Sequence, residues 1–198
     1  MFFPLELLVG LVLFAFATSI TPGPNNMMLL ASGVNFGVRR TVPHMLGISV
    51  GHAFMVFLVG LGLAAVFDAV PWLRGVLKVV GALYMTWLAW KVATAAGSAG
   101  ASGAGKPFTF MQAAAFQWVN PKAWAMALVA VTAYAPDRST WAVATVAMVF
   151  CLVNLPSVGV WAALGQGLRR WLEDAKRRRI FNMVMGVLLI VSIIPFML

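Results

Sequence analysis

TPGPNN, residues 21–26, lies inside an apolar run, residues 7–38, that contains no charged side chain. The run is longer than the ~20 residues that a straight helix needs to cross a bilayer. Pro22 and Pro24 lack a backbone N–H, and each disfavours the helical conformation of the residue before it. We therefore predict a helix that breaks within an apolar segment. Hydrocarbon tolerates such a break only where it lines a cavity or packs on protein.

The chain after this break favours a new helix that begins at Pro24. Proline suits the first turn of a helix, where its missing N–H has no partner to lose. The amide groups near Asn25 and Asn26 would then face the break, with the positive end of the helix dipole behind them. This geometry is typical of an anion-binding site.

VNPKAW, residues 119–124, predicts a second break of the same kind. Asn120 suits the N-cap and Pro121 the first helical position. Lys122 follows within an apolar segment, where a lysine costs at least ~2.5 kcal/mol near the bilayer centre. A cation at the start of a helix also opposes the helix dipole, so a substrate carboxylate would relieve both costs. The alternative is that the ammonium reaches an interface or bonds the carbonyls of the opposite break.

The composition indicates an all-α polytopic membrane protein. Hydrophobic residues make up 62% of the 198 residues and charged residues 10%, and the mean hydropathy is +0.93. A soluble domain would instead spread charge over its whole surface. We expect the first apolar segment to be retained, because it lacks the basic start of a signal peptide. Six transmembrane segments are predicted from their length and apolar character, at residues 5–33, 42–66, 72–94, 109–135, 141–167 and 180–198.

The net charge of +9 indicates an orientation in the lipid bilayer rather than a nucleic-acid partner, because little of this surface would face water. Lysine and arginine collect on the cytoplasmic side of a membrane, where they contact anionic lipid. The second and fourth loops hold only Arg74, Lys78 and Arg138, whereas the odd loops hold Arg39, Arg40, Lys91, Lys106, Arg169, Arg170, Lys176, Arg177, Arg178 and Arg179. We therefore place the odd loops in the cytoplasm and both termini in the periplasm. Tryptophans near segment ends, Trp161 among them, are expected at the membrane interface.

The chain divides around GSAGASGAG, residues 97–105, a run of small residues typical of a flexible linker. We predict a first three-helix repeat at residues 1–96, a cytoplasmic linker at 97–108 and a second repeat at 109–198. A copy with an odd number of spans lies upside down, so the predicted fold is a 3+3 inverted repeat in which helices 1 and 4 are broken. Matches roughly one hundred residues apart support the duplication: TPGPNN with VNPKAW, Leu61 and Gly62 with Leu164 and Gly165, and Gly81 with Gly186.

Four motifs occur in order along nearly the whole chain: TPGPNN at 21–26, LGISVG at 46–51, GALYMTWLAWK at 81–91 and FQWVNPKAW at 116–124. Together they resemble the LysE/RhtB family of amino-acid exporters, the LysE-type translocators. The resemblance implies a six-helix translocator of the bacterial inner membrane, often considered dimeric, that expels amino acids or related metabolites with the proton gradient. It also implies a translocation site at the matching positions, which are Pro22, Gly23, Pro24, Asn25, Asn26, Asn120, Pro121 and Lys122, with Thr21 beside them in the first break.

The distribution of acidic residues bears on the substrate. A dibasic amino acid would need a carboxylate in the pathway, yet all five acidic residues lie near segment ends or in loops. A neutral amino acid fits better, and the motifs are similar to those of exporters of small neutral amino acids, of the cysteine, homoserine or threonine type. Its ammonium would be held by exposed carbonyls at the breaks and by side-chain amides, from Asn25, Asn26, Asn120 or Asn154.

Two histidines can titrate near physiological pH. His52 lies inside the second apolar segment and is our candidate for proton coupling; an equally good interpretation is a buried histidine without a transport role. His44 lies beside Pro43 and close to Arg39 and Arg40, so we expect it at the edge of a loop.

A membrane-embedded enzyme is the alternative from another class, and an accessory or structural subunit is a third. Gly47, Ser49 and Gly51 match the G-x-S-x-G motif of serine hydrolases, but that motif needs a strand, a sharp turn and an acid partner. Gly47 and Gly51 fit a close helix–helix contact better. The scarcity of histidine, cysteine and intramembrane carboxylate argues against an enzyme. For the same reason we expect neither a metal site nor a cofactor.

Overall fold

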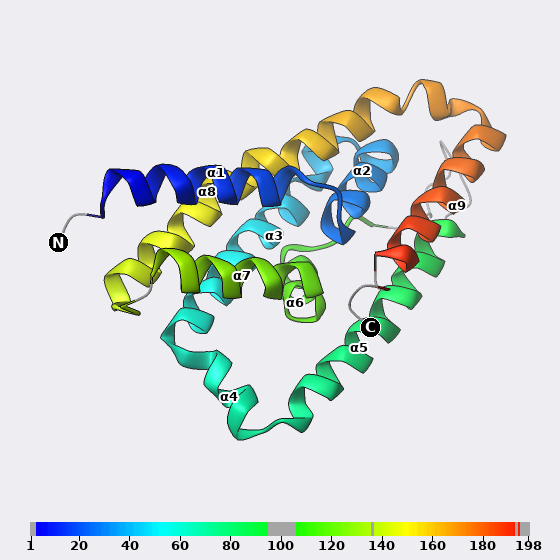
Figure 1. Cartoon of the computed structure of the whole chain (residues 1–198). Helices are drawn as coiled ribbons and strands as arrows, with labels where there is room; N and C mark the ends of the chain where they lie inside the picture. The colour runs from blue at the N-terminus through cyan, green and yellow to red at the C-terminus, as the bar shows by residue number, and fades with distance from the viewer. Residues whose placement is uncertain (1–2, 95–105, 136, 193, 195–198) are drawn as a thin grey trace.

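The computed structural model describes residues 3–94, 106–135, 137–192 and 194, and every regular element in this part of the chain is a helix (Figure 1). Of the predicted linker, 97–108, residues 97–105 lie outside the described residues. The elements in chain order are α1 (Leu5–Ile20), α2 (Pro24–Phe36), α3 (Val38–Leu58), the π-helical turn η1 (Val59–Leu63), α4 (Ala64–Ala69), α5 (Trp72–Ala93), α6 (Phe110–Phe116), the 3₁₀ turn η2 (Gln117–Val119), α7 (Pro121–Tyr134), α8 (Thr140–Leu168), the 3₁₀ turn η3 (Trp171–Glu173) and α9 (Ala175–Val191).

Both predicted breaks are confirmed. Helix α1 ends at Ile20 and α2 begins at Pro24, and the two helices are inclined by 58°. In the second half, α6 gives way to η2, Asn120 adopts an extended conformation and α7 begins at Pro121. Each proline occupies the first position of its new helix, where its missing N–H costs nothing.

Helix α8 is the longest described helix and the main packing partner of the first broken segment. It lies along α1, α2 and α3, and α3 in turn packs on α6. Helices α5 and α9 form a separate pair at the side of this bundle, which Figure 1 shows in green and red. The largest apolar cluster joins α1, α3, α7 and α8 through buried side chains such as Leu11, Met55, Ala130 and Phe150. At the first break Pro24 and Asn26 are buried while Thr21 and Pro22 are exposed, and at the second break Asn120 is buried.

Glycines allow the helices to approach closely at two crossings. Where α2 crosses α8, a Cβ atom on Gly33 would meet the Ala162 carbonyl, and one on Gly165 would meet the Leu30 carbonyl. Where α3 crosses α6, Gly47 and Gly51 face the α6 backbone in the same way. The close contact predicted for Gly47 and Gly51 is confirmed.

Three helical stretches in the described part are long and apolar enough to cross a membrane: Val38–Leu63, Gly75–Ala93 and Thr140–Leu168. The bent pair α1 and α2 makes a fourth candidate, as one broken span. Large apolar side chains such as Phe16, Leu83 and Leu152 are exposed on these helices, which suits lipid contact. The described part of the chain is thus all-helical, with three or four candidate spans by length and composition.

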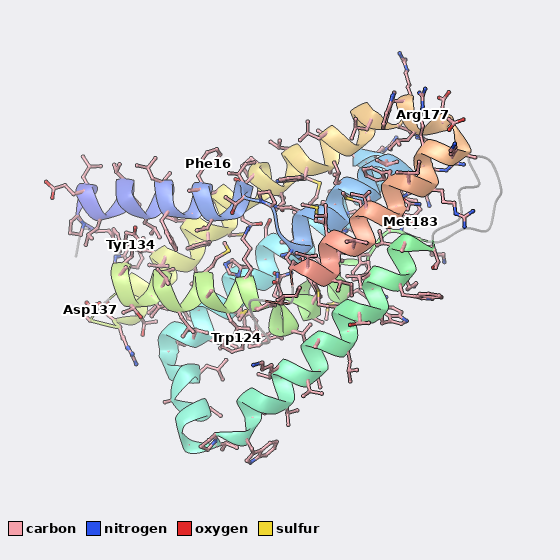
Figure 2. The ribbon with its side chains drawn as sticks, turned by 45° about the vertical axis from the view of Figure 1, so that its right-hand side comes forward. Phe16, Trp124, Tyr134, Asp137, Arg177 and Met183 are labelled. Carbon is pink, nitrogen blue, oxygen red and sulfur yellow. The ribbon has the colours of Figure 1, made fainter. Side chains whose placement is uncertain are left out.

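Basic residues are concentrated at one end of the molecule. Figure 2 shows Arg177, at the start of α9, at one end, and Tyr134 and Asp137, around the end of α7, at the other. The turn between α2 and α3 lies beside the end of α8, because the Val38 N–H donates to Gln166 Oε1 at 2.7 Å. The basic residues of this turn and of the α8–α9 connection therefore gather at one end.

The α2–α8 crossing gives a test of the packing. Gly165→Ala would force the Leu30 carbonyl away and should lower stability by about 1–3 kcal/mol. Gly167→Ala on the same helix has nothing within 4 Å of its new methyl group and should be neutral or slightly stabilising. Thermal unfolding of both purified variants in detergent measures the difference. Equal midpoints for the two variants would contradict this crossing.

Candidate functional site

The two breaks meet at a polar chamber inside the bundle. Seven of the residues predicted for the site line it: Gly23, Asn25, Asn26, His52, Asn120, Lys122 and Asn154. The other predicted residues form the breaks themselves: Thr21, Pro22, Pro24 and Pro121. The volume open to the centre of a water molecule is about 20 Å³, which is room for roughly one or two waters. In this conformation the space inside the chamber is therefore smaller than an amino acid.

The carbonyl groups before the first break are bonded by protein side chains. The Ser19 carbonyl accepts from Asn26 Nδ2 at 2.9 Å, and the Ile20 carbonyl accepts from Trp161 Nε1 at 3.0 Å. Asn26 Nδ2 also donates to the Thr21 carbonyl at 2.7 Å. Helix α1 thus ends without leaving these acceptors bare. We expected exposed carbonyls here; in this conformation they are already bonded, because α2 and α8 supply donors.

Lys122 closes the first break from the opposite half of the chain. Its Nζ donates to the Thr21 carbonyl at 2.7 Å, to Thr21 Oγ1 at 2.9 Å and to the Pro22 carbonyl at 3.4 Å. The lysine stem runs past Gly23, where a Cβ atom would lie 2.9 Å from Lys122 Cδ. Of the two alternatives for this lysine, the structure therefore contains the bonds to the opposite break.

The polar groups at the second break bond mainly within their own segment of the chain. Asn120 is buried, and its Oδ1 accepts from the Lys122 N–H at 3.2 Å, as expected of an N-cap. Gln117, in η2, exchanges two hydrogen bonds with Asn25 at 2.9 and 3.3 Å. Sequence reasoning missed Gln117, although an uncharged polar residue beside a predicted break within an apolar segment was a usable signal. This amide pair joins the two halves across the chamber.

Asn154 links three helices at the back of the chamber. Its Nδ2 donates to Ser19 Oγ on α1 at 3.1 Å, and Ser49 Oγ on α3 donates to its Oδ1 at 3.0 Å. Ser49 thus bonds an amide, whereas a serine nucleophile would need a bond to a histidine. The described residues also contain no group of three histidines, cysteines or acidic residues. Ser19 and Ser49 were not predicted as site residues.

The two histidines have different surroundings. His52 is buried on α3, lines the chamber and lies edge-on to Phe150, with ring centroids 5.2 Å apart. Neither of its ring nitrogens has a hydrogen-bond partner among the described residues. His44 is also buried and stacks on Phe108. The expected loop edge is wrong for His44, because Pro43 lies inside α3 and the helix carries His44 into the interior.

The described lining of the chamber contains a basic side chain but no acidic one. Lys122 is the only basic or acidic side chain, histidine apart, among the described residues that line it, and the remaining polar lining consists of amides, hydroxyls and His52. A single cation among amides and helix ends suits a ligand that brings one carboxylate. A helical membrane protein with a polar chamber between two broken helices has the organisation of a membrane transporter.

Comparisons with known proteins agree with this class. The family model of the LysE type translocator matches residues 16–197. A cysteine/O-acetylserine efflux protein of Escherichia coli O139:H28 (strain E24377A / ETEC) is 30% identical over 179 residues, which are 87% of this chain and 88% of that protein. Proteins of the same name from Escherichia coli (strain K12) and Shigella flexneri are 29% identical over the same shares. No solved structure matches.

The chain therefore belongs to the LysE type translocator family. It is a multi-pass membrane transporter and not an enzyme.

The bond from Trp161 to the first break predicts a stability effect. Trp161→Phe keeps an aromatic ring but leaves the Ile20 carbonyl without its donor, at a cost of about 1–3 kcal/mol. Trp141→Phe changes an exposed tryptophan on the same helix and should have little effect. We expect the unfolding midpoint in detergent to fall only for Trp161→Phe. A drop of the same size in both variants would show that this bond contributes nothing.

Proposed function

We propose that this protein exports a small neutral amino acid or a related metabolite across the bacterial inner membrane. The observation that carries the proposal is the single ammonium of Lys122, held in a chamber whose described lining has no carboxylate. A zwitterion could enter such a chamber without adding net charge, whereas a dibasic molecule would add an uncompensated cation. The relatives are named for cysteine and O-acetylserine, which are both small and neutral.

The substrate would bind where the two breaks meet, in contact with Thr21, Pro22, Gly23, Pro24, Asn25, Asn26, Asn120, Pro121, Lys122 and Asn154. Its carboxylate would lie near Lys122 and the first turn of α2, where a positive charge and the positive end of a helix dipole coincide. The side-chain amides would supply the remaining donors and acceptors.

We propose that the fold is a 3+3 inverted repeat of six spans, with halves at residues 1–96 and 109–198. The packing supports this, because exchanging the halves maps the major pairs of packed helices onto one another. The first broken segment, α1 and α2, packs on α8, and the second, α6 and α7, packs on α3. The remaining major pairs, α3 with α8 and α5 with α9, each join corresponding elements.

Transport would proceed by alternating access, with one half rocking against the other. The small size of the chamber supports this, since about 20 Å³ cannot hold an amino acid. Several sets of bonds cross between the halves at the chamber, among them the Asn25–Gln117 pair, the bonds of Lys122 to Thr21 and Pro22, and the bonds of Asn154 to Ser19 and Ser49. Opening the chamber would have to break at least one set.

The orientation follows from the charges. We propose that the end that carries Arg39, Arg40, Arg169, Arg170 and the start of α9 faces the cytoplasm, and that both termini face the periplasm. We further propose a homodimer in the lipid bilayer, as the family resemblance implies.

A transport assay tests the substrate class. In inside-out membrane vesicles from cells that express the protein, we expect accumulation of L-cysteine, O-acetyl-L-serine, L-homoserine or L-threonine. L-Lysine and L-glutamate should not accumulate, because the described lining of the chamber offers no anion for the lysine side chain and no second cation for the glutamate side chain. Vesicles without the protein provide the background. Transport of L-lysine at the rate of the neutral amino acids would contradict the proposal.

Proton antiport through His52 needs a separate test. His52→Gln removes the titrating ring from the chamber, and His44→Gln removes the other buried histidine of α3, which does not line it. In proteoliposomes we expect His52→Gln to lose accumulation driven by a pH gradient but to keep exchange of labelled for unlabelled substrate, which needs no net proton transfer. His44→Gln should keep both. Normal gradient-driven accumulation by His52→Gln would rule out this role.

A further inference from the structure

We infer that the Lys122 ammonium occupies the binding site of the substrate's own ammonium group, and that the two exchange places when substrate binds. This inference rests on the proposed function and names how that site recognises an amino acid. Lys122 would then act twice, as a stand-in for the substrate ammonium in this conformation and as the partner of the substrate carboxylate in the substrate-bound one.

The acceptors around Lys122 Nζ match a primary ammonium. The Thr21 carbonyl at 2.7 Å, Thr21 Oγ1 at 2.9 Å and the Pro22 carbonyl at 3.4 Å offer three oxygens, and a primary ammonium has three N–H donors. The α-ammonium of an amino acid carries the same three donors. The acceptors also lie just beyond the last residue of α1, where the negative end of a helix dipole favours a cation. The site is therefore a cation subsite built from the backbone.

The position of Lys122 itself is unfavourable without those acceptors. It is the second residue of α7, so its charge lies at the positive end of that helix. No carboxylate lines the chamber among the described residues. When another ammonium takes the oxygens of Thr21 and Pro22, Lys122 needs a new anion. An amino acid supplies one within two bonds of its ammonium, so the lysine has only a short distance to move.

Gly23 leaves space for that movement. A Cβ atom at this position would lie 2.9 Å from Lys122 Cδ and 3.2 Å from Nζ. The lysine stem therefore lies directly along the backbone of the break, and no side chain of residue 23 fixes it there. The exchange also conserves charge, because a zwitterion brings one cation to the oxygens and one anion to the lysine.

The exchange predicts that the two halves of a substrate help one another to bind. Cysteamine has the ammonium and thiol of cysteine without the carboxylate, and 3-mercaptopropionate has the carboxylate without the ammonium. Cysteamine alone must displace Lys122 and leave it unpaired. With 3-mercaptopropionate present, the displaced lysine gains its partner. In the wild-type protein we expect each fragment to increase the affinity of the other at least about fivefold, by the same factor in both directions.

Removing the lysine reverses the preference between the fragments. Lys122→Met leaves the oxygens of Thr21 and Pro22 without a competitor, so cysteamine should bind several-fold more tightly than to the wild type. The same variant should bind 3-mercaptopropionate at least about tenfold more weakly and should lose the mutual enhancement. Lys91→Met, on the exposed face of α5, is the matched control and should behave as wild type.

Ligand-dependent shifts of the unfolding midpoint of the full chain in detergent measure these affinities, with L-cysteine as the complete ligand and a reductant present throughout. If L-cysteine and the other neutral amino acids all fail to bind, the proposed function is overturned together with this inference. If L-cysteine binds but the fragments show no mutual enhancement in the wild type, only this inference is overturned. That measurement needs no variant, so a misfolded Lys122→Met would not prevent a decision. A folded Lys122→Met that weakens both fragments equally would also overturn it.

Discussion

A backbone carbonyl that loses its helical partner inside a membrane must find another donor, because hydrocarbon supplies none and each unsatisfied group costs several kcal/mol. The break after Ile20 creates this problem for the end of α1. Its solution comes from three directions: Asn26 from α2, Trp161 from α8 and Lys122 from α7. The break thus fixes the positions of three other helices around itself. The polar chamber exists because these donors converge on one point of the chain.

The same requirement couples binding to conformational change. The Lys122 bonds cross from one half of the chain to the other, with about one hundred residues between the partners. Moving the halves apart would leave the Pro22 carbonyl without that donor and the Thr21 carbonyl with Asn26 alone, unless another donor arrives. A substrate ammonium is such a donor. Under the function that we propose, an empty transporter would therefore resist opening, and a loaded one could open at a lower cost. Opening would also break the two bonds between Asn25 and Gln117. That loss would cost less, because both side chains can turn to water or to the substrate.

Local chemistry in the sequence was enough to predict where the helices break. Proline at the first helical position and Asn120 as an N-cap depend only on neighbours in the chain, and both are found as predicted. The partners of the freed carbonyls depend on packing, which the sequence does not reveal. Trp161 was expected at the membrane interface, but its indole bonds Ile20, 141 residues away in the chain. Asn26 was expected to face the substrate, and although it does line the chamber, its amide donors are used by α1. His44 was misplaced because a proline and two arginines suggested a loop, although α3 continues through them.

The two breaks are alike in sequence but unequal in structure. The second is closed largely within its own segment, where Asn120 caps α7 and its N–H bonds the Gln117 carbonyl at 3.3 Å. The first relies on side chains from elsewhere. Other matched positions have diverged too: Gly62 allows a bend with a positive φ, whereas Gly165 allows a close helix contact. If the halves arose by duplication, as we propose, the difference between the two breaks lets them bind different groups of one substrate. One break offers acceptors for a cation, and the other supplies a mobile cation that can bind an anion. Two identical breaks would offer the same group twice, and a zwitterion needs both.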